Sequence, residues 1–234
     1  MFRRQSHITV PTSCNTKYMR VNVYVISMPG SPRRPVISSH LAANSIPFTF
    51  WDGVLVPADA EGRRQLIRDA GGDPDGVTLV DGTLGCLLAH VGLWRHLADG
   101  ANTEVAMVLE DDVMCNSAVD FRSLDVDALM KNHDYCFLHM YPCRPTGAQA
   151  QLITPAAARL LTLNASAILA KNSPVDLMVW MNLPKSVSLR IGDAYRGGHG
   201  AWLFRHASNY DDVSHSERMQ INLERNRCTT DYAN

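Results

Sequence analysis

The chain has 234 residues, of which 46% are hydrophobic and 19% charged, a composition typical of a globular protein with one sizeable core. Lysine and arginine number 22 against 23 acidic residues, so the net charge of −1 excludes a global attraction to nucleic acid. The six cysteines have no CxxC or zinc-like spacing, which favours reduced thiols over a disulfide framework and predicts a cytoplasmic protein.

Residues 1–20 show no hydrophobic periodicity, and we expect a flexible tail there and a second tail over residues 217–234. The N-terminal segment lacks the apolar run of a signal peptide or membrane span, so we expect neither secretion nor a transmembrane segment. Peripheral attachment at the inner face of a membrane stays open. One domain is expected over residues 21–216.

Between the tails, apolar and amphipathic runs alternate along the chain. The expected strands are residues 21–28, 48–54, 105–109, 134–140, 151–154 and 187–191. The expected helices are residues 35–45, 58–70, 83–97, 125–131, 155–163 and 174–182. The near-continuous apolar run at 105–109 (VAMVL) is typical of a central strand covered on both faces. Together these elements predict an α/β sheet with helices on both faces.

Three carboxylates, Glu110, Asp111 and Asp112, follow the expected strand at 105–109. Open α/β sheets bind ligands beyond the carboxyl ends of their strands, which is where these residues are expected. In an extended segment, alternation sends Glu110 and Asp112 to one side and Asp111 to the other. Two carboxylates on one side can hold a hard divalent ion, and a cation, arginines or helix N-termini would offset the repulsion among the three acids. A helix N-cap or a solvated loop would explain the same acids, so both interpretations stay open.

Five segments of the chain occur in an order that carries a family resemblance. They are VYVISMPGSPRR (23–34), IPFTFWDGV (46–54), GTLGCLLAHVGLW (82–94), VLEDDV (108–113), and QLITPAAARLL (151–161) with SPVD (173–176). Taken together they resemble glycosyltransferase family 25, the lipooligosaccharide galactosyltransferases and their procollagen-modifying relatives. The resemblance implies a GT-A type fold, a nucleotide-sugar-binding Rossmann-like sandwich with a mixed, mainly parallel sheet. Two positions depart from the family pattern, Ser27 where Asn is usual and Ala89 where Ser is usual.

The resemblance also implies roles for individual residues. Glu110 and Asp112 would bind Mn²⁺ or Mg²⁺ that bridges the diphosphate of a UDP-sugar, and Asp111 would orient the donor or the other ligands. The implied donor-binding residues are Arg34, which suits phosphate or uracil, with Asp52 and His90. The alternatives are a solvent-facing arginine at position 34 and a hydrogen-bonded packing histidine at position 90.

Sugar transfer with inversion needs a carboxylate that takes the proton of the acceptor hydroxyl. Asp176 is the first candidate for this base and Asp212 the second, although a helix N-cap explains Asp176 nearly as well. His215 is a candidate to complete the metal sphere, against the alternative of a chance placement.

The resemblance thus implies a metal-dependent inverting transferase that moves a hexose, first of all galactose from UDP-galactose, onto an oligosaccharide or glycolipid. The core of lipooligosaccharide or lipopolysaccharide is the expected kind of acceptor, and no nucleic-acid partner is expected. Two other functions stay open. A metal-dependent phosphodiesterase or nuclease could use the same carboxylates with a second metal cluster, and the departures at Ser27 and Ala89 would suit an inactive sugar-binding relative.

Overall fold

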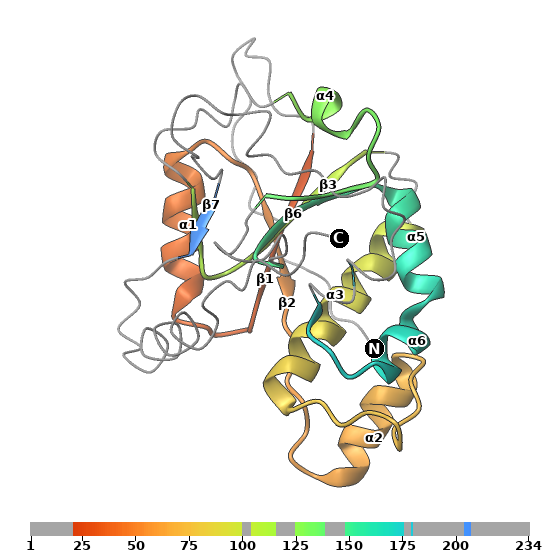
Figure 1. Cartoon of the computed structure of the whole chain (residues 1–234). Coiled ribbons are helices and arrows are strands. Elements are labelled where there is room, and N and C mark those ends of the chain that lie inside the picture. The colour runs from red at the N-terminus through yellow and green to blue at the C-terminus, as the bar shows by residue number, and fades with distance from the viewer. Residues whose placement is uncertain are drawn as a thin grey trace, which may run out of the picture.

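The computed structural model describes residues 21–99, 104–115, 125–138, 148–175, 179 and 204–206. Both expected tails lie outside these residues, as do the strand expected at 187–191 and most of the helix expected at 174–182. The described residues form a five-stranded sheet with helices on both faces, so the fold class is α/β, as predicted (Figure 1). Within this part of the chain, no helix has both the length and the apolarity needed to cross a membrane.

The sheet is mixed, and its strands have the order β2-β1-β3-β6-β5. They are β1 (Asn22–Ser27), β2 (Thr49–Asp52), β3 (Ala106–Glu110), β5 (Tyr135–Phe137) and β6 (Ala150–Ile153). β1 pairs in parallel with β2 and β3, whereas β6 pairs antiparallel with both β3 and β5. Four of the five strands therefore run in one direction and β6 runs against them, which matches the expected mixed, mainly parallel sheet.

Helices cover the two faces of the sheet unequally. Apolar side chains of α1 (Arg33–Ala43) and α4 (Val126–Met130) belong to the buried cluster on one face. The cluster on the other face includes residues of α2 (Ala60–Asp69), α3 (Asp81–Asp99), α5 (Pro155–Leu163) and α6 (Ala165–Ala170). Figure 1 shows α1 on one side of the strands and α3 with α5 on the other.

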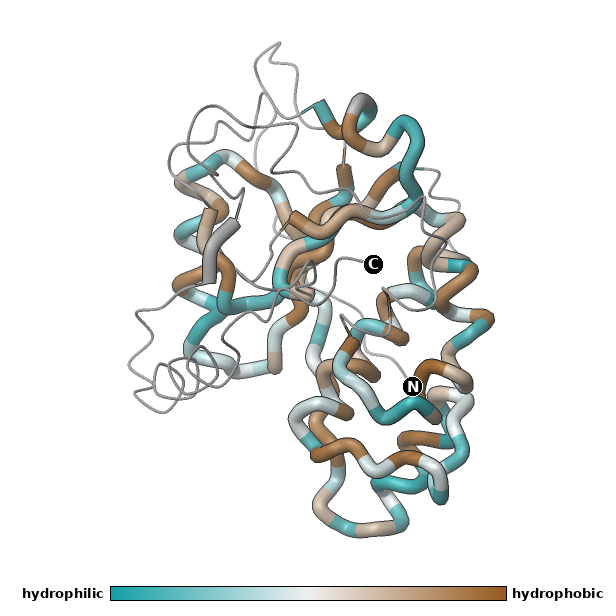
Figure 2. Tube along the Cα trace, in the orientation of Figure 1, coloured by the Kyte–Doolittle hydropathy of each residue, from teal (hydrophilic) through white to brown (hydrophobic). Residues whose placement is uncertain are grey.

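The central strand β3 is buried on both faces. Ala106 and Val108 lie in the cluster on the α3 side, whereas Met107 and Leu109 lie in the cluster on the α1 side. All four are at most 1% exposed, which confirms the prediction from the continuous apolar run. Figure 2 shows the same run as hydrophobic colour through the middle of the sheet.

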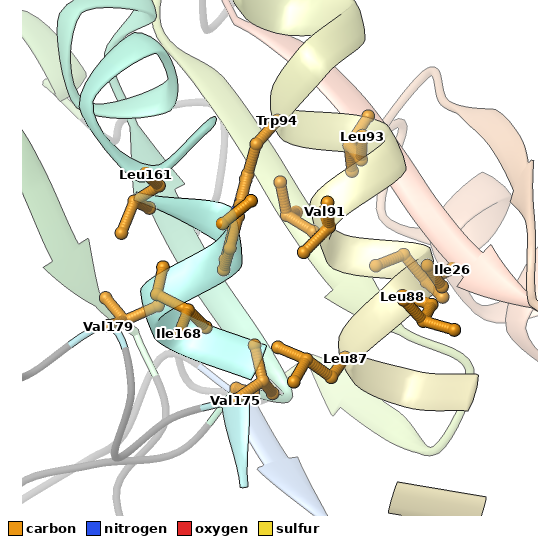
Figure 3. Packing of buried hydrophobic residues seen from close by; sticks show 14 of the residues in the cluster. Ile26, Leu87, Leu88, Val91, Leu93, Trp94, Leu161, Ile168, Val175 and Val179 are labelled. Carbon is orange, nitrogen blue, oxygen red and sulfur yellow. The ribbon is translucent and has the colours of Figure 1, made fainter. Parts of the chain in front are cut away.

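The helix predicted at 83–97 is α3, and its apolar stripe is buried. Figure 3 shows Leu87, Val91 and Trp94 of this helix facing Leu161 of α5 and Ile168 of α6. The period of three or four residues in the sequence thus identified the face of α3 that packs between the sheet and the other helices.

Three short elements were not predicted. α6 follows α5 after Asn164, which is the C-cap of one helix and the N-cap of the other. β4 (Val113–Cys115) begins just after the acidic residues and pairs antiparallel with β7 (Phe204–His206) in a separate two-stranded sheet. A pair of three-residue strands so far apart in sequence leaves no local pattern to detect.

Two buried cysteines, Cys115 of β4 and Cys136 of β5, are expected to be inert in the native protein. Burial raises the pKa of each thiol from 9.0 to about 12, because the thiolate loses hydration. We expect iodoacetamide at about pH 8 to leave both unlabelled until the protein is denatured, as measured by peptide mass spectrometry. Labelling of either in the native protein at the rate of a small free thiol would contradict this expectation.

The raised pKa values of Cys115 and Cys136 predict that the free energy of unfolding falls as the pH rises above about 9. The unfolded thiols ionise near their ordinary pKa of 9.0, whereas the folded thiols ionise only near 12. Their stabilising effect is complete below about pH 9 and is lost as the pH rises from there towards about 12. Denaturant titrations between about pH 8 and 10 should show a falling free energy of unfolding, with a smaller fall in the Cys136→Ala variant.

Candidate active site

The carboxyl ends of three parallel strands lie side by side at one edge of the sheet. Ser27 at the end of β1 pairs in register with Asp52 at the end of β2, and Ile26 of β1 pairs with Glu110 at the end of β3. The Glu110 amide donates a hydrogen bond of 2.8 Å to the carbonyl of Gln149, next to the start of β6. The acidic segment therefore lies at the edge where the sequence places it, and this edge is the candidate site.

The expected alternation of side chains through residues 110–112 is wrong. β3 ends at Glu110, and Asp111 and Asp112 form a turn before β4 begins at Val113. Glu110 Oε1 lies 3.4 Å from His90 Nε2 on the α3 side of the sheet. Asp111 and Asp112 both approach Arg33 Nη1 instead, at 3.3 and 3.9 Å. The alternation argument therefore does not put Glu110 and Asp112 on one side, because it requires an extended chain.

Asp111 connects the turn after β3 to the loop between β1 and α1. Its Oδ2 accepts hydrogen bonds from the hydroxyls of Ser27 at 2.7 Å and Ser31 at 3.1 Å. Its Oδ1 accepts one from Arg33 at 3.3 Å, and the side chain is 14% exposed. Both oxygens are thus engaged with protein donors, and the expected role of Asp111 in orienting the donor or the other ligands stays a prediction. Ser27, one of the departures from the family pattern, is a partner in this network.

We expect the Asp111→Ala variant to lose about 1–3 kcal/mol of unfolding free energy, because the buried Ser27 hydroxyl and two further donors lose a charged acceptor. Chemical denaturation followed by tryptophan fluorescence measures the loss. Asp75→Ala is the control, since Asp75 forms an exposed ion pair with Arg64 and its removal should leave the midpoint nearly unchanged. Equal midpoints for the two variants would contradict the anchoring role of Asp111.

Arg34 joins the ends of β1 and β2. Its Nη2 donates to the Ser27 carbonyl at 2.8 Å and to Asp52 Oδ1 at 2.5 Å. The guanidinium also lies 4.5 Å from the centre of the Phe50 ring. The alternative of a solvent-facing arginine is therefore wrong. Arg34 and Asp52 lie together at the candidate site, while their expected contact with a donor stays a prediction.

His90 is fully buried and hydrogen-bonded, as the packing interpretation expected, and it also touches the acidic segment. Its Nδ1 lies 3.2 Å from Gln151 Nε2 of β6, and its Nε2 lies 3.4 Å from Glu110 Oε1. The Cys86 thiol donates to the same Glu110 oxygen at 3.6 Å. The three groups form a polar cluster with Glu110 at the edge of an otherwise apolar interface between α3 and the sheet.

The absence of a side chain at Gly85 allows α3 to pack closely against the segment after β2. A Cβ on Gly85 would overlap the Val54 carbonyl oxygen, so any larger residue would push the helix away. Trp51 of β2 secures the same helix, because its Nε1 donates to the Ala89 carbonyl at 3.1 Å. These two contacts hold Cys86 and His90 of α3 opposite Glu110.

Three predicted residues, Asp176, Asp212 and His215, lie outside the described residues, so their roles stay predictions. Sequence reasoning also missed contributors to the site, among them Gln151 and Arg33. Gln151 was detectable, since it is a polar residue inside an apolar run that was assigned to a buried strand. Arg33 had no distinguishing signal beside Arg34, because the two arginines are adjacent after Pro32 and both precede the helix expected at residues 35–45.

Comparison with known proteins gives the chain a family. Residues 20–162 match the profile of glycosyltransferase family 25 (LPS biosynthesis protein). A Haemophilus influenzae protein with the name "Putative glycosyltransferase" is 26% identical over an alignment of 176 residues, which covers 67% of this chain and 60% of that protein. This chain thus spans about three fifths of the length of that relative.

The crystal structure of a glycosyltransferase involved in the glycosylation of the major capsid of PBCV-1 aligns with 70% of this chain and 72% of that one. The TM-score is 0.36 and the identity 12%, a similarity too low to infer one fold from the other. The match to the family profile, in contrast, covers more than half of the sequence, including β1, α3, β3 and the acidic turn. The chain therefore belongs to glycosyltransferase family 25.

Proposed function

We propose that this chain is a metal-dependent inverting glycosyltransferase of GT-A type. It would transfer a hexose, first of all galactose from UDP-galactose, to an oligosaccharide or glycolipid such as the core of lipooligosaccharide or lipopolysaccharide. The observation that carries the proposal is the acidic turn at the carboxyl edge of β1, β2 and β3, in a chain that belongs to this family. Open α/β sheets bind their ligands at such an edge.

The carboxylates at this edge have the donor chemistry that suits a hard divalent cation. Glu110 and Asp112 bring carboxylate oxygens, the ligands that Mn²⁺ and Mg²⁺ prefer, and their side chains are 20% and 16% exposed. These two residues would hold the ion, with His215 as a further candidate. Such an ion stabilises the negative charge that develops on a departing diphosphate. Asp111 is engaged with Ser27, Ser31 and Arg33 and would position the turn rather than bind the ion.

Two arginines would serve the donor in different ways. Arg33 lies beside Asp111 and Asp112, so its guanidinium would add positive charge next to the diphosphate. Arg34 is held by hydrogen bonds to Asp52 and to the Ser27 carbonyl. Arg34 and Asp52 would together shape the part of the site that binds the nucleotide. For removal of the acceptor proton we propose Asp176 first and Asp212 second.

The test is a screen of nucleotide sugars against the purified full chain, with and without Mn²⁺. Melting temperatures should rise most with UDP-galactose and Mn²⁺ together, because a ligand that binds only the native state stabilises it. Slow release of UDP and free galactose should accompany the shift. Absence of any shift with UDP-galactose, UDP-glucose, UDP-N-acetylglucosamine or GDP-mannose would contradict the proposal.

The products separate the competing functions. A phosphodiesterase would break the diphosphate and yield UMP and galactose 1-phosphate, whereas a transferase breaks the bond between sugar and diphosphate and yields UDP. A sugar-binding protein without activity would show the thermal shift and no product. In a transfer to an oligosaccharide, proton NMR of the new linkage reports inversion or retention.

A further inference from the structure

Cys86, His90 and Glu110 bring three different metal-ligand types together. Cys86 and His90 are four residues apart on α3, which places them on one face of the helix, and Glu110 ends the neighbouring strand β3. The ligand atoms of the three side chains all lie within 4.8 Å of one another. Glu110 Oε1 is 3.4 Å from His90 Nε2 and 3.6 Å from Cys86 Sγ.

The two separations from Glu110 Oε1 match those around a tetrahedral zinc ion. With bonds of about 2.3 Å to sulfur and about 2.0 Å to nitrogen or oxygen, tetrahedral angles put the ligand atoms roughly 3.3–3.5 Å apart. The separations of Glu110 Oε1 from His90 Nε2 and from Cys86 Sγ, 3.4 and 3.6 Å, would thus need almost no adjustment. Thiolate and imidazole also select zinc over manganese and magnesium, which prefer oxygen.

Gln151 supplies a second, independent observation. It is 1% exposed, and within the described part of the chain its Oε1 is buried without a hydrogen-bond partner. Its Nε2 lies 3.2 Å from His90 Nδ1. If the Gln151 side-chain amide turns over, Gln151 Oε1 accepts a hydrogen bond from His90 Nδ1–H. The lone pair of His90 Nε2 then faces Glu110. A hydrogen-bond acceptor on the far nitrogen is the support that metal-binding histidines usually have.

We propose that Cys86, His90 and Glu110 bind a thiophilic divalent transition metal such as Zn²⁺. Without metal, the thiol and the imidazole are hydrogen-bonded to the carboxylate. On binding, the thiol proton leaves to solvent, the imidazole proton resides on Nδ1, and the ion takes the place of both hydrogen bonds. His90 is fully buried, while Cys86 and Glu110 are partly exposed. Solvent can therefore reach the ion. Because the chain supplies three of the four tetrahedral ligands, the fourth position is open to water or an exogenous ligand.

This site differs in chemistry from the manganese site proposed above and shares Glu110 with it. The proposal does not depend on glycosyl transfer, because its test is spectroscopic. Co²⁺ added to the metal-stripped full chain should give the visible absorption of tetrahedral cobalt and a near-ultraviolet thiolate-to-cobalt band, both at one ion per chain. Zn²⁺ should abolish both bands, whereas Mn²⁺ at the same concentration should not.

Variants assign the bands to this cluster. Cys86→Ser should remove the thiolate band. Gln151 contacts His90 Nδ1, which is not one of the three ligand atoms, and Gln151→Leu should weaken Co²⁺ affinity about 10–100-fold. Cys136→Ala is the matched control, since Cys136 is buried on the opposite face of the sheet and its loss should leave both bands intact. Wild-type protein without a thiolate band, or a Cys86→Ser variant that keeps it, would overturn the proposal. Melting curves in EDTA verify that each variant is folded.

Discussion

Replacing Asp112 by alanine is expected to lower the Mn²⁺-dependent release of UDP from UDP-galactose by about 10²–10³-fold. The Asp112 carboxylate lies in the turn at the carboxyl edge of the sheet, and we propose that it and Glu110 hold the ion that offsets the charge of the leaving diphosphate. Under this proposal, its loss would remove one oxygen ligand of the ion, and the charge on the diphosphate would be offset less well. Initial rates of UDP formation over a range of Mn²⁺ concentrations measure the effect.

Two further variants serve as controls for Asp112→Ala. Asp75→Ala removes an exposed carboxylate from an ion pair with Arg64 and should keep the wild-type rate. Asp112→Glu retains the carboxylate on a longer side chain, so its rate should recover in part at high Mn²⁺ concentration. A folded Asp112→Ala protein with the wild-type rate and Mn²⁺ dependence would show that this residue does not hold the ion.

Replacing Gly85 by alanine is expected to cost about 1–3 kcal/mol of unfolding free energy. The added Cβ would overlap the backbone carbonyl of Val54, which cannot rotate away as a side chain could, so α3 or the segment after β2 must shift. The same shift would carry Cys86 and His90 away from Glu110, and we expect the rate of UDP formation to fall along with stability. Guanidinium denaturation and the UDP assay together measure both losses.

Gly82 offers a matched control on the same helix. A Cβ at Gly82 meets nothing within 4 Å, so Gly82→Ala should be neutral or should stabilise the protein by up to about 1 kcal/mol through helix propensity. The two substitutions make the same chemical change and differ only in what the methyl group meets. If both variants unfold at the same denaturant concentration, the close approach at Val54 does not limit the packing of α3.

The elements that the sequence predicts well are those in which buried apolar residues recur in a regular pattern along the chain. β3 is covered on both faces and therefore reads as an unbroken apolar run, and α3 buries a stripe with the period of a helix. β4 and α6 lack such a repeat. β4 has only three residues and pairs with a strand far along the chain, and α6 continues an apolar stretch beyond Asn164 with no new signal.

The location of the candidate site could be predicted, but the directions of its side chains could not. The apolar run of β3 determines where Glu110 emerges from the sheet, whereas the turn at Asp111 and Asp112 depends on contacts with the loop after β1. Arg33 and Arg34 illustrate the same limit. Successive residues at the start of a helix point about 100° apart, so the start of α1 decides which of them meets Asp111 and which meets Asp52.

The reversed direction of β6 affects how such a protein could diversify. Because β5 and β6 are antiparallel neighbours, the chain leaves β5 and re-enters β6 at the edge that carries Glu110, where the Leu138 amide donates to the Ala150 carbonyl at 2.8 Å. The connection between these strands can therefore vary in length and composition while both of its ends stay anchored. Exchange of this one connection between relatives would change the chain that joins the two strands at this edge and leave the sheet as it is.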